Sequence, residues 1–266
     1  MEILNKINNL KNKTILITGA TGYLGREFSK TFSEIGSRLI CIDSPDSDFD
    51  ALTSYIGGKN IEHSFYECNL EVEEERAMLF EKINSEYEVI DVAINNAAFV
   101  GTSNLTGWIS KFEEQSVETW RRAFEVNLTS IFDIVKNLTP LFKKSESASI
   151  INISSIYASS APDHRIYEET TMGNSAAYAA SKGGLNQLTK WLSTTLAPNI
   201  RVNSVSPGGI YRGQPDSFVK NYISRTPMLR MGTEEDMCGA VVFLASDLSL
   251  YITGQNLIVD GGWSVW

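Results

Sequence analysis

"ILITGATGYLGREF" (residues 15–28) decides the fold, because an apolar strand runs into a glycine-rich turn and then into a helix. Gly19, Gly22 and Gly25 occupy the turn and the start of the helix. A GxxGxxG string alone is a weak signal. Between a strand and a helix, however, glycines permit a tight turn and a close approach of backbone to a pyrophosphate, which the helix N-terminus also favours. The stretch therefore predicts nucleotide binding over the alternative, a plain turn.

Asp43 ends the second apolar run, 18 residues after Gly25. An acid at this place accepts hydrogen bonds from a ribose 2′-OH and repels a 2′-phosphate. The alternative is an aspartate that merely starts a loop. Because it follows the glycine turn and has no basic residue immediately after it, Asp43 predicts NAD rather than NADP. Arg26 is the residue to suspect of holding a 2′-phosphate if NADP were preferred.

Short apolar runs alternate with longer helical patterns along the whole chain. Strands are expected at 13–20, 37–43, 64–70, 89–98, 148–155, 200–209 and 254–262. Helices are expected at 23–36, 116–144, 176–197 and 233–247. This succession implies right-handed βαβ units, and hence an α/β fold with a doubly wound parallel sheet covered by helices on both faces. We expect one domain over 1–266. The aperiodic segments 156–177 and 209–230 follow strand ends, where ligands bind in such sheets.

"SAAYAASKGG" (175–184) places Tyr178 and Lys182 four residues apart on an expected helix. The chain contains an internal control, because Tyr55 and Lys59 in "YIGGK" share the spacing. That second copy has two glycines between its ends and no apolar strand before it, so we interpret it as a loop. Spacing alone leaves open whether Tyr178 and Lys182 form a surface pair or an active site, and the context has to decide.

Composition narrows the class of protein. The chain carries a net charge of −9 over 266 residues, which argues against a basic patch for nucleic acid or anionic membranes. No apolar run approaches the length of a membrane span, and no secretory signal is visible at the start. Three scattered cysteines without a CxxC and only two histidines make a metal site or a disulfide framework improbable. We expect a cytoplasmic protein without a metal.

The chain resembles the short-chain dehydrogenase/reductase family over nearly its whole length. The landmarks, in the family's order, are "TGATGYLG", Asp43, "CNL" at 68–70, "NNAA" at 95–98, "VNLTS" around Asn127, "INISS" at 151–155, "YAASK" at 178–182, "SPGGI" at 206–210 and "DGG" at 260–262. The resemblance implies a Rossmann-type fold that binds NAD(P). It further implies cofactor contacts from Gly19, Thr21, Gly22, Tyr23, Leu24, Gly25, Asp43, Asn69, Leu70, Asn96, Ala97, Tyr178, Lys182, Pro207, Gly208 and Ile210.

The resemblance also implies catalytic roles. Tyr178 would be the acid/base, and Lys182 would bind the nicotinamide ribose and lower the pKa of the tyrosine. Ser155, rather than its neighbour Ser154, would polarise the substrate carbonyl, and Asn127 would help order a proton relay to the lysine. The chemistry is sensible, because a free tyrosine titrates near ~10 and a nearby positive charge favours the phenolate.

Three departures from the family pattern stand out. The middle glycine is residue 22 rather than 23, as in the extended branch that includes nucleotide-sugar epimerases and dehydratases, although the added C-terminal substrate domain of that branch is lacking. Arg212 replaces a threonine, which puts one nicotinamide-carboxamide contact in doubt. Ser155 and Tyr178 are 23 residues apart, a wider gap than in many classical members, so the insert 156–177 is expected beside the substrate.

The insert resembles members of the family from bacterial flagellin-glycosylation and surface-polysaccharide gene clusters, whose presumed substrates are sugars or activated sugars. Its His164 and Arg165 are adjacent, and an arginine fork suits phosphate or carboxylate. We expect Arg165, with His164, to meet an anionic group of the substrate. The alternative is that Arg165 pairs with Asp163, Glu168 or Glu169 and steadies the loop. An insert that packs on itself with no polar substrate role also remains open.

The sequence as a whole predicts an NAD-dependent oxidoreductase acting on a secondary alcohol or ketone of a carbohydrate derivative. Two alternatives stay open: a nucleotide-sugar epimerase or dehydratase, and a non-catalytic cofactor-binding regulator. By resemblance we expect a homodimer or homotetramer, formed through the helices at 116–144 and 175–197. Their large aromatic side chains could instead be buried within one subunit; these are Trp120, Phe124, Phe132 and Trp191.

Overall fold

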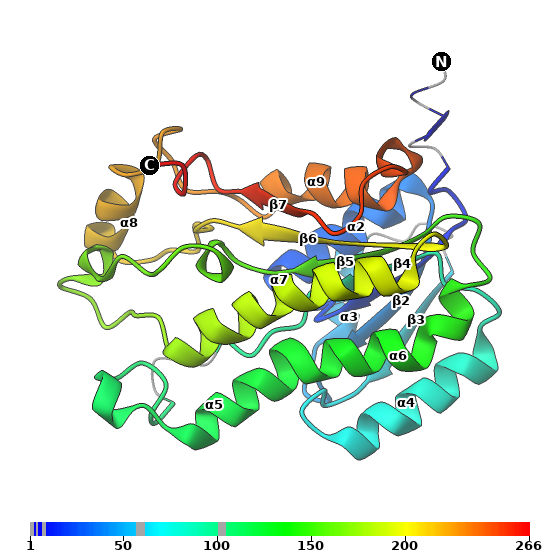
Figure 1. Ribbon diagram of the computed structural model, residues 1–266, viewed down its shortest axis with the longest axis horizontal. Helices are drawn as coiled ribbons and strands as arrows, with labels where there is room; N and C mark the ends of the chain where they lie inside the picture. The colour runs from blue at the N-terminus through cyan, green and yellow to red at the C-terminus, as the bar shows by residue number, and fades with distance from the viewer. Residues whose placement is uncertain (1–2, 4, 7–8, 57–61, 101–104) are drawn as a thin grey trace.

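The computed structural model describes all residues except 1–2, 4, 7–8, 57–61 and 101–104. Its centre is a parallel sheet of seven strands in the order β3-β2-β1-β4-β5-β6-β7 (Figure 1). The strands are β1 (Thr14–Thr18), β2 (Arg38–Asp43), β3 (His63–Glu67), β4 (Val92–Asn95), β5 (Ala148–Ile153), β6 (Ile200–Pro207) and β7 (Asn256–Val259). Each lies inside or within one residue of an expected run, so the predicted doubly wound α/β fold is confirmed.

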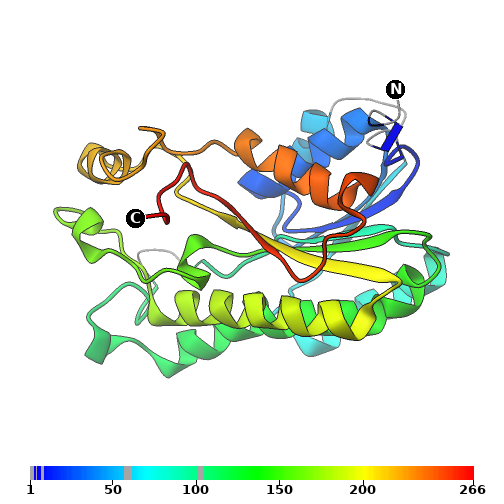
Figure 2. The ribbon, with the colours of Figure 1, turned by 45° about the horizontal axis from the view of Figure 1, so that its top comes forward.

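Helices cover both faces of the sheet (Figures 1 and 2). One face carries α2 (Tyr23–Ile35), α3 (Phe49–Ile56) and α9 (Glu235–Ala245). The other carries α4 (Glu73–Glu86), α6 (Ser130–Phe142) and α7 (Ala176–Leu196), with α5 (Val117–Phe124) packed on α7. In β1, Ile15 and Ile17 belong to the first core and Leu16 to the second. Alternate side chains of a strand point to opposite faces, so two buried faces require the near-continuous apolar runs seen in the sequence.

The helix expected at 116–144 forms, but it has a π-helical stretch at Glu125–Thr129 between α5 and α6. Ser116 caps its N-terminus by accepting hydrogen bonds from the backbone N–H groups of Glu118 and Thr119. A π stretch widens one turn of a helix and is frequent at functional sites. Here it contains the fully buried Asn127.

Other helices were not expected from the sequence. These are α3, α4 and α8 (Asp216–Ile223), the last of which lies inside the aperiodic segment 209–230. The interpretation of "YIGGK" as a loop is wrong for its first two residues, because Tyr55 and Ile56 end α3; residues 57–59 lie outside the described residues. Among the described residues, no helix is long and apolar enough to cross a membrane.

The aromatic side chains of the helices at 116–144 and 175–197 are mostly not buried within the chain. Trp120 is 39%, Phe132 43% and Trp191 56% exposed. Phe124 is half-buried and stacks on Trp120 with ring centroids 4.9 Å apart. Of the two alternatives left open by the sequence, the structure therefore excludes burial inside one subunit for Trp120, Phe132 and Trp191.

Candidate active site

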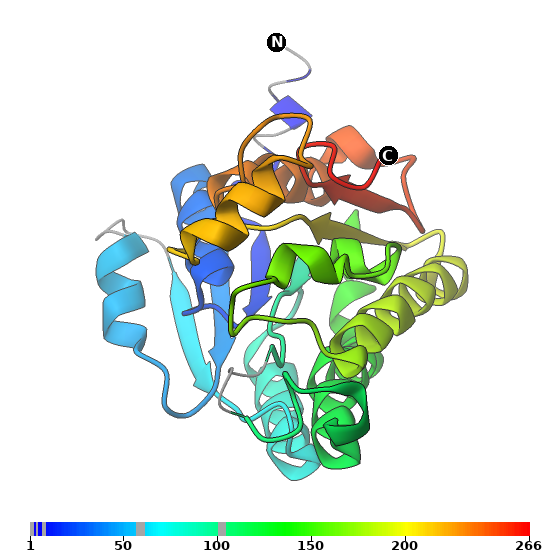
Figure 3. The same cartoon turned by 90° about the vertical axis from the view of Figure 1, so that its left-hand side faces the viewer.

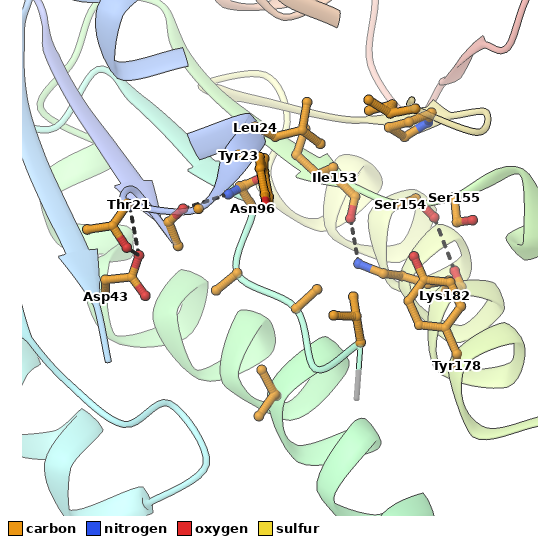
Figure 4. A pocket seen from close by; sticks show the side chains of 18 of the residues that line it. Thr21, Tyr23, Leu24, Asp43, Asn96, Ile153, Ser154, Ser155, Tyr178 and Lys182 are labelled. Carbon is orange, nitrogen blue, oxygen red and sulfur yellow. Dashed lines mark hydrogen bonds between the residues drawn. The ribbon is translucent and has the colours of Figure 1, made fainter. Parts of the chain in front are cut away.

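A cavity of about 620 Å³ opens at the carboxyl ends of the central strands (Figure 4). The predicted residues that line it are Gly19, Thr21, Gly22, Tyr23, Leu24, Asp43, Asn69, Leu70, Asn96, Ala97, Ser155, Tyr178, Lys182, Pro207, Gly208 and Ile210. Four predicted residues do not line it: Gly25, Asn127, His164 and Arg165. Asp43 and Thr21 lie at one end of the cavity, while Ser155, Tyr178 and Lys182 lie at the other.

The glycine turn requires its glycines. Gly19 has a φ of +65°, and a Cβ there would lie 2.9 Å from the Cα of Ala97. A Cβ on Gly25 would lie 1.9 Å from the carbonyl oxygen of Gly19, so Gly25 serves the packing of turn on helix rather than the cavity. Gly22 is the N-cap of α2 and makes no side-chain cap, so the N-terminus of the helix faces the cavity uncovered. This turn fits a pyrophosphate.

The "NNAA" run holds the turn in place. The Asn96 side chain donates to the carbonyl oxygens of Thr18 (3.1 Å) and Gly19 (3.0 Å). In return, the hydroxyl of Thr18 accepts from the backbone N–H groups of Asn96 and Ala97, each at 3.0 Å. The end of β4 is thereby tied to the end of β1, which explains why this run lies beside the glycine turn rather than in an ordinary loop.

The Asp43 carboxylate is oriented before any ligand arrives. One oxygen accepts hydrogen bonds from the backbone N–H (2.8 Å) and the hydroxyl (2.7 Å) of Thr21, and the other from the backbone N–H of Ser44 (2.8 Å). Asn69, on the next strand end, also lines the cavity. A fixed, partly buried carboxylate at this end suits a ribose diol and opposes a 2′-phosphate by charge repulsion.

Tyr178 and Lys182 share one face of α7, whose N-terminus is capped by Ser175. The Lys182 side chain is 1% exposed, and its Nζ donates to the carbonyl oxygen of Ile153 at 2.7 Å. Ser154 donates to the carbonyl oxygen of Lys182, whereas the Ser155 side chain acts to lower the pKa of Tyr178. The geometry therefore favours Ser155 over its neighbour as the residue that works with the tyrosine.

Burial sets the proton affinities at this end of the cavity. It raises the pKa of Tyr178, against which a hydrogen bond from Ser155 and the charge of Arg212 act to lower it. Burial also lowers the pKa of Lys182 to about 8. Tyr178 therefore keeps its proton at neutral pH, ready to be donated. The lysine ammonium lies 5.9 Å from the centre of the tyrosine ring.

Asn127 does not line the cavity but connects two segments beside it through hydrogen bonds. Its side-chain oxygen accepts from the backbone N–H of Phe99 at 2.6 Å, and its amide donates to the carbonyl of Phe99 and to the hydroxyl of Ser181. Ser181 precedes Lys182 on α7. The π stretch thus joins the segment after β4 to the helix that carries the tyrosine and lysine, and its asparagine positions them.

The structure does not bring His164 and Arg165 to the cavity. Arg165 is 72% exposed and pairs with Asp163 through two contacts of 2.9 Å. Arg225 binds the same carboxylate. This arrangement supports the alternative in which Arg165 steadies the loop.

Sequence reasoning missed the residues through which the insert packs against α8. The hydroxyls of Tyr157 and Tyr167 lie 2.7 Å apart, and Tyr167 contributes to raising the pKa of Tyr178. Both rings pack in a cluster that includes Phe218 of α8 and Trp263. Figure 3 shows α8 and the 156–177 segment lying together across the carboxyl edge of the sheet. A tyrosine two residues after Ser155 was the signal available in the sequence.

No group of three or more His, Cys, Asp or Glu side chains suited to a metal ion occurs within the described part of the chain. The cavity brings together a phenol, a hydroxyl and an ammonium, those of Tyr178, Ser155 and Lys182.

Comparison with known proteins gives consistent matches. The family model for enoyl-(acyl carrier protein) reductase matches residues 19–264. The chain is 31% identical over 258 residues to 3-oxoacyl-(acyl-carrier-protein) reductase FabG of Thermotoga maritima, covering 95% of this chain and 98% of that protein. It is also 31% identical over 259 residues to the post-translational flagellin modification protein A of Campylobacter coli, covering 96% and 100%.

A solved structure shares the fold as well. The short chain dehydrogenase of Leptospira borgpetersenii, with bound NAD+, is 33% identical and superposes with a TM-score of 0.81, over 96% of this chain and 94% of that one.

Proposed function

Because the chain belongs to the short-chain dehydrogenase/reductase family, we propose that it is an NAD-dependent enzyme that interconverts a secondary alcohol and a ketone. The observation that carries this proposal is one cavity shared by the glycine turn, Asp43, Ser155, Tyr178 and Lys182. When bound, the nicotinamide supplies or accepts the hydride. The protein supplies orientation, a proton and charge.

In the reducing direction, the Ser155 hydroxyl donates a hydrogen bond to the ketone oxygen, where negative charge develops. Tyr178 gives its phenolic proton to that oxygen as the alcohol forms. The Lys182 ammonium, which donates to the carbonyl of Ile153, would hold the ribose hydroxyls of a bound cofactor and stabilise the phenolate that remains. In the oxidising direction the proton moves back to Tyr178. Asn127 positions α7 throughout.

We further propose a carbohydrate or activated-sugar substrate, bound between the insert 156–177 and the segment 209–230, which acts as a lid. Support comes from the position of α8 and the 156–177 segment across the carboxyl edge of the sheet, where a shared cluster holds the two segments together through Tyr157, Tyr167, Phe218 and Trp263. The similarity to the flagellin modification protein points the same way. The similarity to acyl reductases makes a 3-oxoacyl thioester the competing substrate.

Oxidation of NADH, followed by absorbance, tests the proposal with a panel of keto-sugars, nucleotide-linked sugars and a 3-oxoacyl thioester. Turnover of a keto-sugar supports the proposed substrate class. Turnover of the thioester alone would replace that class. A sugar product that is epimerised or dehydrated without net NADH consumption would establish the alternative enzyme class. If NADH binds and no panel member reacts, the non-catalytic regulator gains support.

We expect wild-type enzyme to bind NADH more tightly than NADPH, because the Asp43 carboxylate attracts a ribose diol and repels a 2′-phosphate. Asp43→Ser should weaken NADH binding by about 10–100-fold, as the loss of hydrogen bonds to a charged group predicts. Fluorescence titration of both cofactors measures this. Asp50→Asn removes an exposed charge from α3 and is the control. Equal or tighter binding of NADPH by the wild type would refute the preference.

We also propose a homodimer or homotetramer built on the helices α5, α6 and α7, supported by the exposure of Phe132 and Trp191. Trp191→Glu should raise the dissociation constant of the assembly by at least about tenfold, because large aromatics dominate interface energies. Light scattering after size exclusion measures the mass. Met78→Glu, at a 71% exposed position on α4, is the control. A monomeric wild type, or a Trp191→Glu variant whose mass equals that of the wild type, would contradict this interface.

A further inference from the structure

Arg212, which departs from the family pattern, lies at the mouth of the glycine turn. Its guanidinium carbon is 4.5 Å from the centroid of the Tyr23 ring, and Tyr23 follows directly after the N-cap of α2. Its Nε donates to Glu234 at 2.8 Å, and 35% of its side chain is exposed. Both Arg212 and Tyr23 line the cavity. A permanent cation therefore stands beside a helix N-terminus that already favours an anion.

The loop around Arg212 is held rather than free to swing. The Gln214 side chain accepts from the backbone N–H of Arg212 and donates to the carbonyl of Ile210, each at 2.7 Å. Between them Gly213 adopts a φ of +75°, which the turn needs. The guanidinium is thus presented from a clamped turn, with Glu234 fixing its Nε edge.

The fork of Arg212 retains unused donors. An arginine offers five N–H groups, and within the described residues only the Nε–H of Arg212 has a hydrogen-bond partner. The two terminal nitrogens are left for a bidentate contact, which arginine makes with phosphate. Arg212 and Tyr178 line the same cavity, and the charge of Arg212 acts to lower the pKa of Tyr178.

Arg26 provides a contrast on the same ring. Its guanidinium lies 5.1 Å from the Tyr23 centroid and 5.5 Å from that of Tyr55, so it too is a cation stacked on Tyr23. It is exposed and does not line the cavity. Both arginines therefore stack on Tyr23, but of the two only Arg212 lines the cavity.

From these contacts we propose that Arg212 is a cofactor-binding residue that grips the pyrophosphate of the dinucleotide through its terminal nitrogens, with Tyr23 as its platform. This inference rests on the proposed function, because it assigns a residue to the same cofactor. Arg212 would then bind the pyrophosphate, whereas the threonine that it replaces would contact the nicotinamide carboxamide. Charge-assisted, bidentate hydrogen bonds from the guanidinium favour this contact.

The test is equilibrium binding to purified full-length protein, without turnover. Arg212→Gln should weaken NADH, ADP-ribose and ADP, which all carry the pyrophosphate, by about tenfold each. Adenosine, which has no phosphate, should bind as it does to the wild type. Arg212→Lys should fall between, because it keeps the charge and loses the fork. Arg26→Gln, the matched control, should leave all four affinities unchanged.

If Arg212→Gln folds poorly, Glu234→Gln tests the inference instead, because it frees the guanidinium from a competing anion. ADP-ribose should then bind more tightly, and an unchanged affinity would count against the proposal. Unchanged binding of ADP and ADP-ribose by Arg212→Gln would overturn the proposal. A rise in the substrate KM would then assign Arg212 to an anionic group of the substrate. A lower melting temperature as the sole effect would make Arg212 part of a structural ion pair. Failure of the wild type to bind NADH would refute the proposed function itself. NADH binding by the wild type that is unchanged in the Arg212 variants would refute only the role of Arg212.

Discussion

Replacing Tyr178 by phenylalanine is expected to reduce turnover by about 10²–10⁴-fold, the range typical for removing a general acid or base. The variant keeps the ring that packs against Ala177 and Trp108 in the small core beside the cavity and loses only the hydroxyl. NADH affinity and melting temperature should therefore change little. Rates with saturating substrate, together with NADH titration and thermal unfolding, separate these quantities.

Tyr55→Phe is the matched control for Tyr178→Phe. Tyr55 lies in the last turn of α3, is 37% exposed and bonds Glu27 rather than any residue of the cavity. Its ring, over which Arg26 and Lys30 lie, survives the change. Near-normal turnover in Tyr178→Phe would remove the tyrosine from the mechanism, whereas a loss in both variants would point to a general effect of removing a hydroxyl.

The pH dependence follows from the raised pKa of Tyr178. Reduction uses the protonated phenol, which the free enzyme holds throughout the neutral range, so reduction should be lost only at alkaline pH. Oxidation uses the phenolate and should rise with pH. A bound nicotinamide with its positive charge favours the phenolate and shifts the oxidation profile to lower pH.

The sheet could be predicted because β1, β4, β5 and β6 are buried on both faces, so the signal of each is an apolar run. Helices were harder, since their signal depends on periodicity and length. The eight-residue α3 and α8 are too short to show a full amphipathic repeat, and α4 begins with three consecutive glutamates, Glu73 to Glu75. The π stretch at Asn127 has no signature of its own, because it reads as part of one long helix.

The cofactor side of the site was predictable because strand ends of a parallel sheet meet at one edge, so residues distant in the sequence converge. The substrate side was not. His164 and Arg165 have suggestive chemistry, but only the tertiary packing of two aperiodic segments decides which side chains face inward. It packs Tyr157 and Tyr167 into the cluster with α8 and leaves Arg165 paired with Asp163. The same holds for Arg212, whose contact with Tyr23 joins segments nearly 190 residues apart.

Lys182→Met is expected to reduce turnover by about 10–100-fold, as removal of a charge-assisted contact to the ribose and the phenolate predicts. The same change should also remove the free-energy cost of burying a charged lysine in the folded protein. The side chain is buried, and its pKa falls from the ordinary 10.5 to about 8, a shift that corresponds to about 3 kcal/mol. A buried methionine carries no such penalty, although the carbonyl of Ile153 loses its partner, which offsets part of the gain.

The pH dependence of stability separates these opposing contributions. Below pH 8 both the folded and the unfolded wild-type chain hold the proton on Lys182, so the burial penalty is complete. Between about pH 8 and 10.5 the folded chain releases this proton while the unfolded chain keeps it, and wild-type stability rises with pH relative to the methionine variant. Urea titrations at pH 7 and pH 10 measure the free energy of unfolding of both proteins. The contributions of all other titrating groups cancel in the difference between the wild type and the variant.

Lys190→Met, at an exposed position of α7, controls for the loss of one lysine from the helix. A wild type and a Lys182→Met variant whose stabilities run parallel with pH would show that Lys182 is not held as a buried charge, and unimpaired turnover in that variant would remove it from the chemistry.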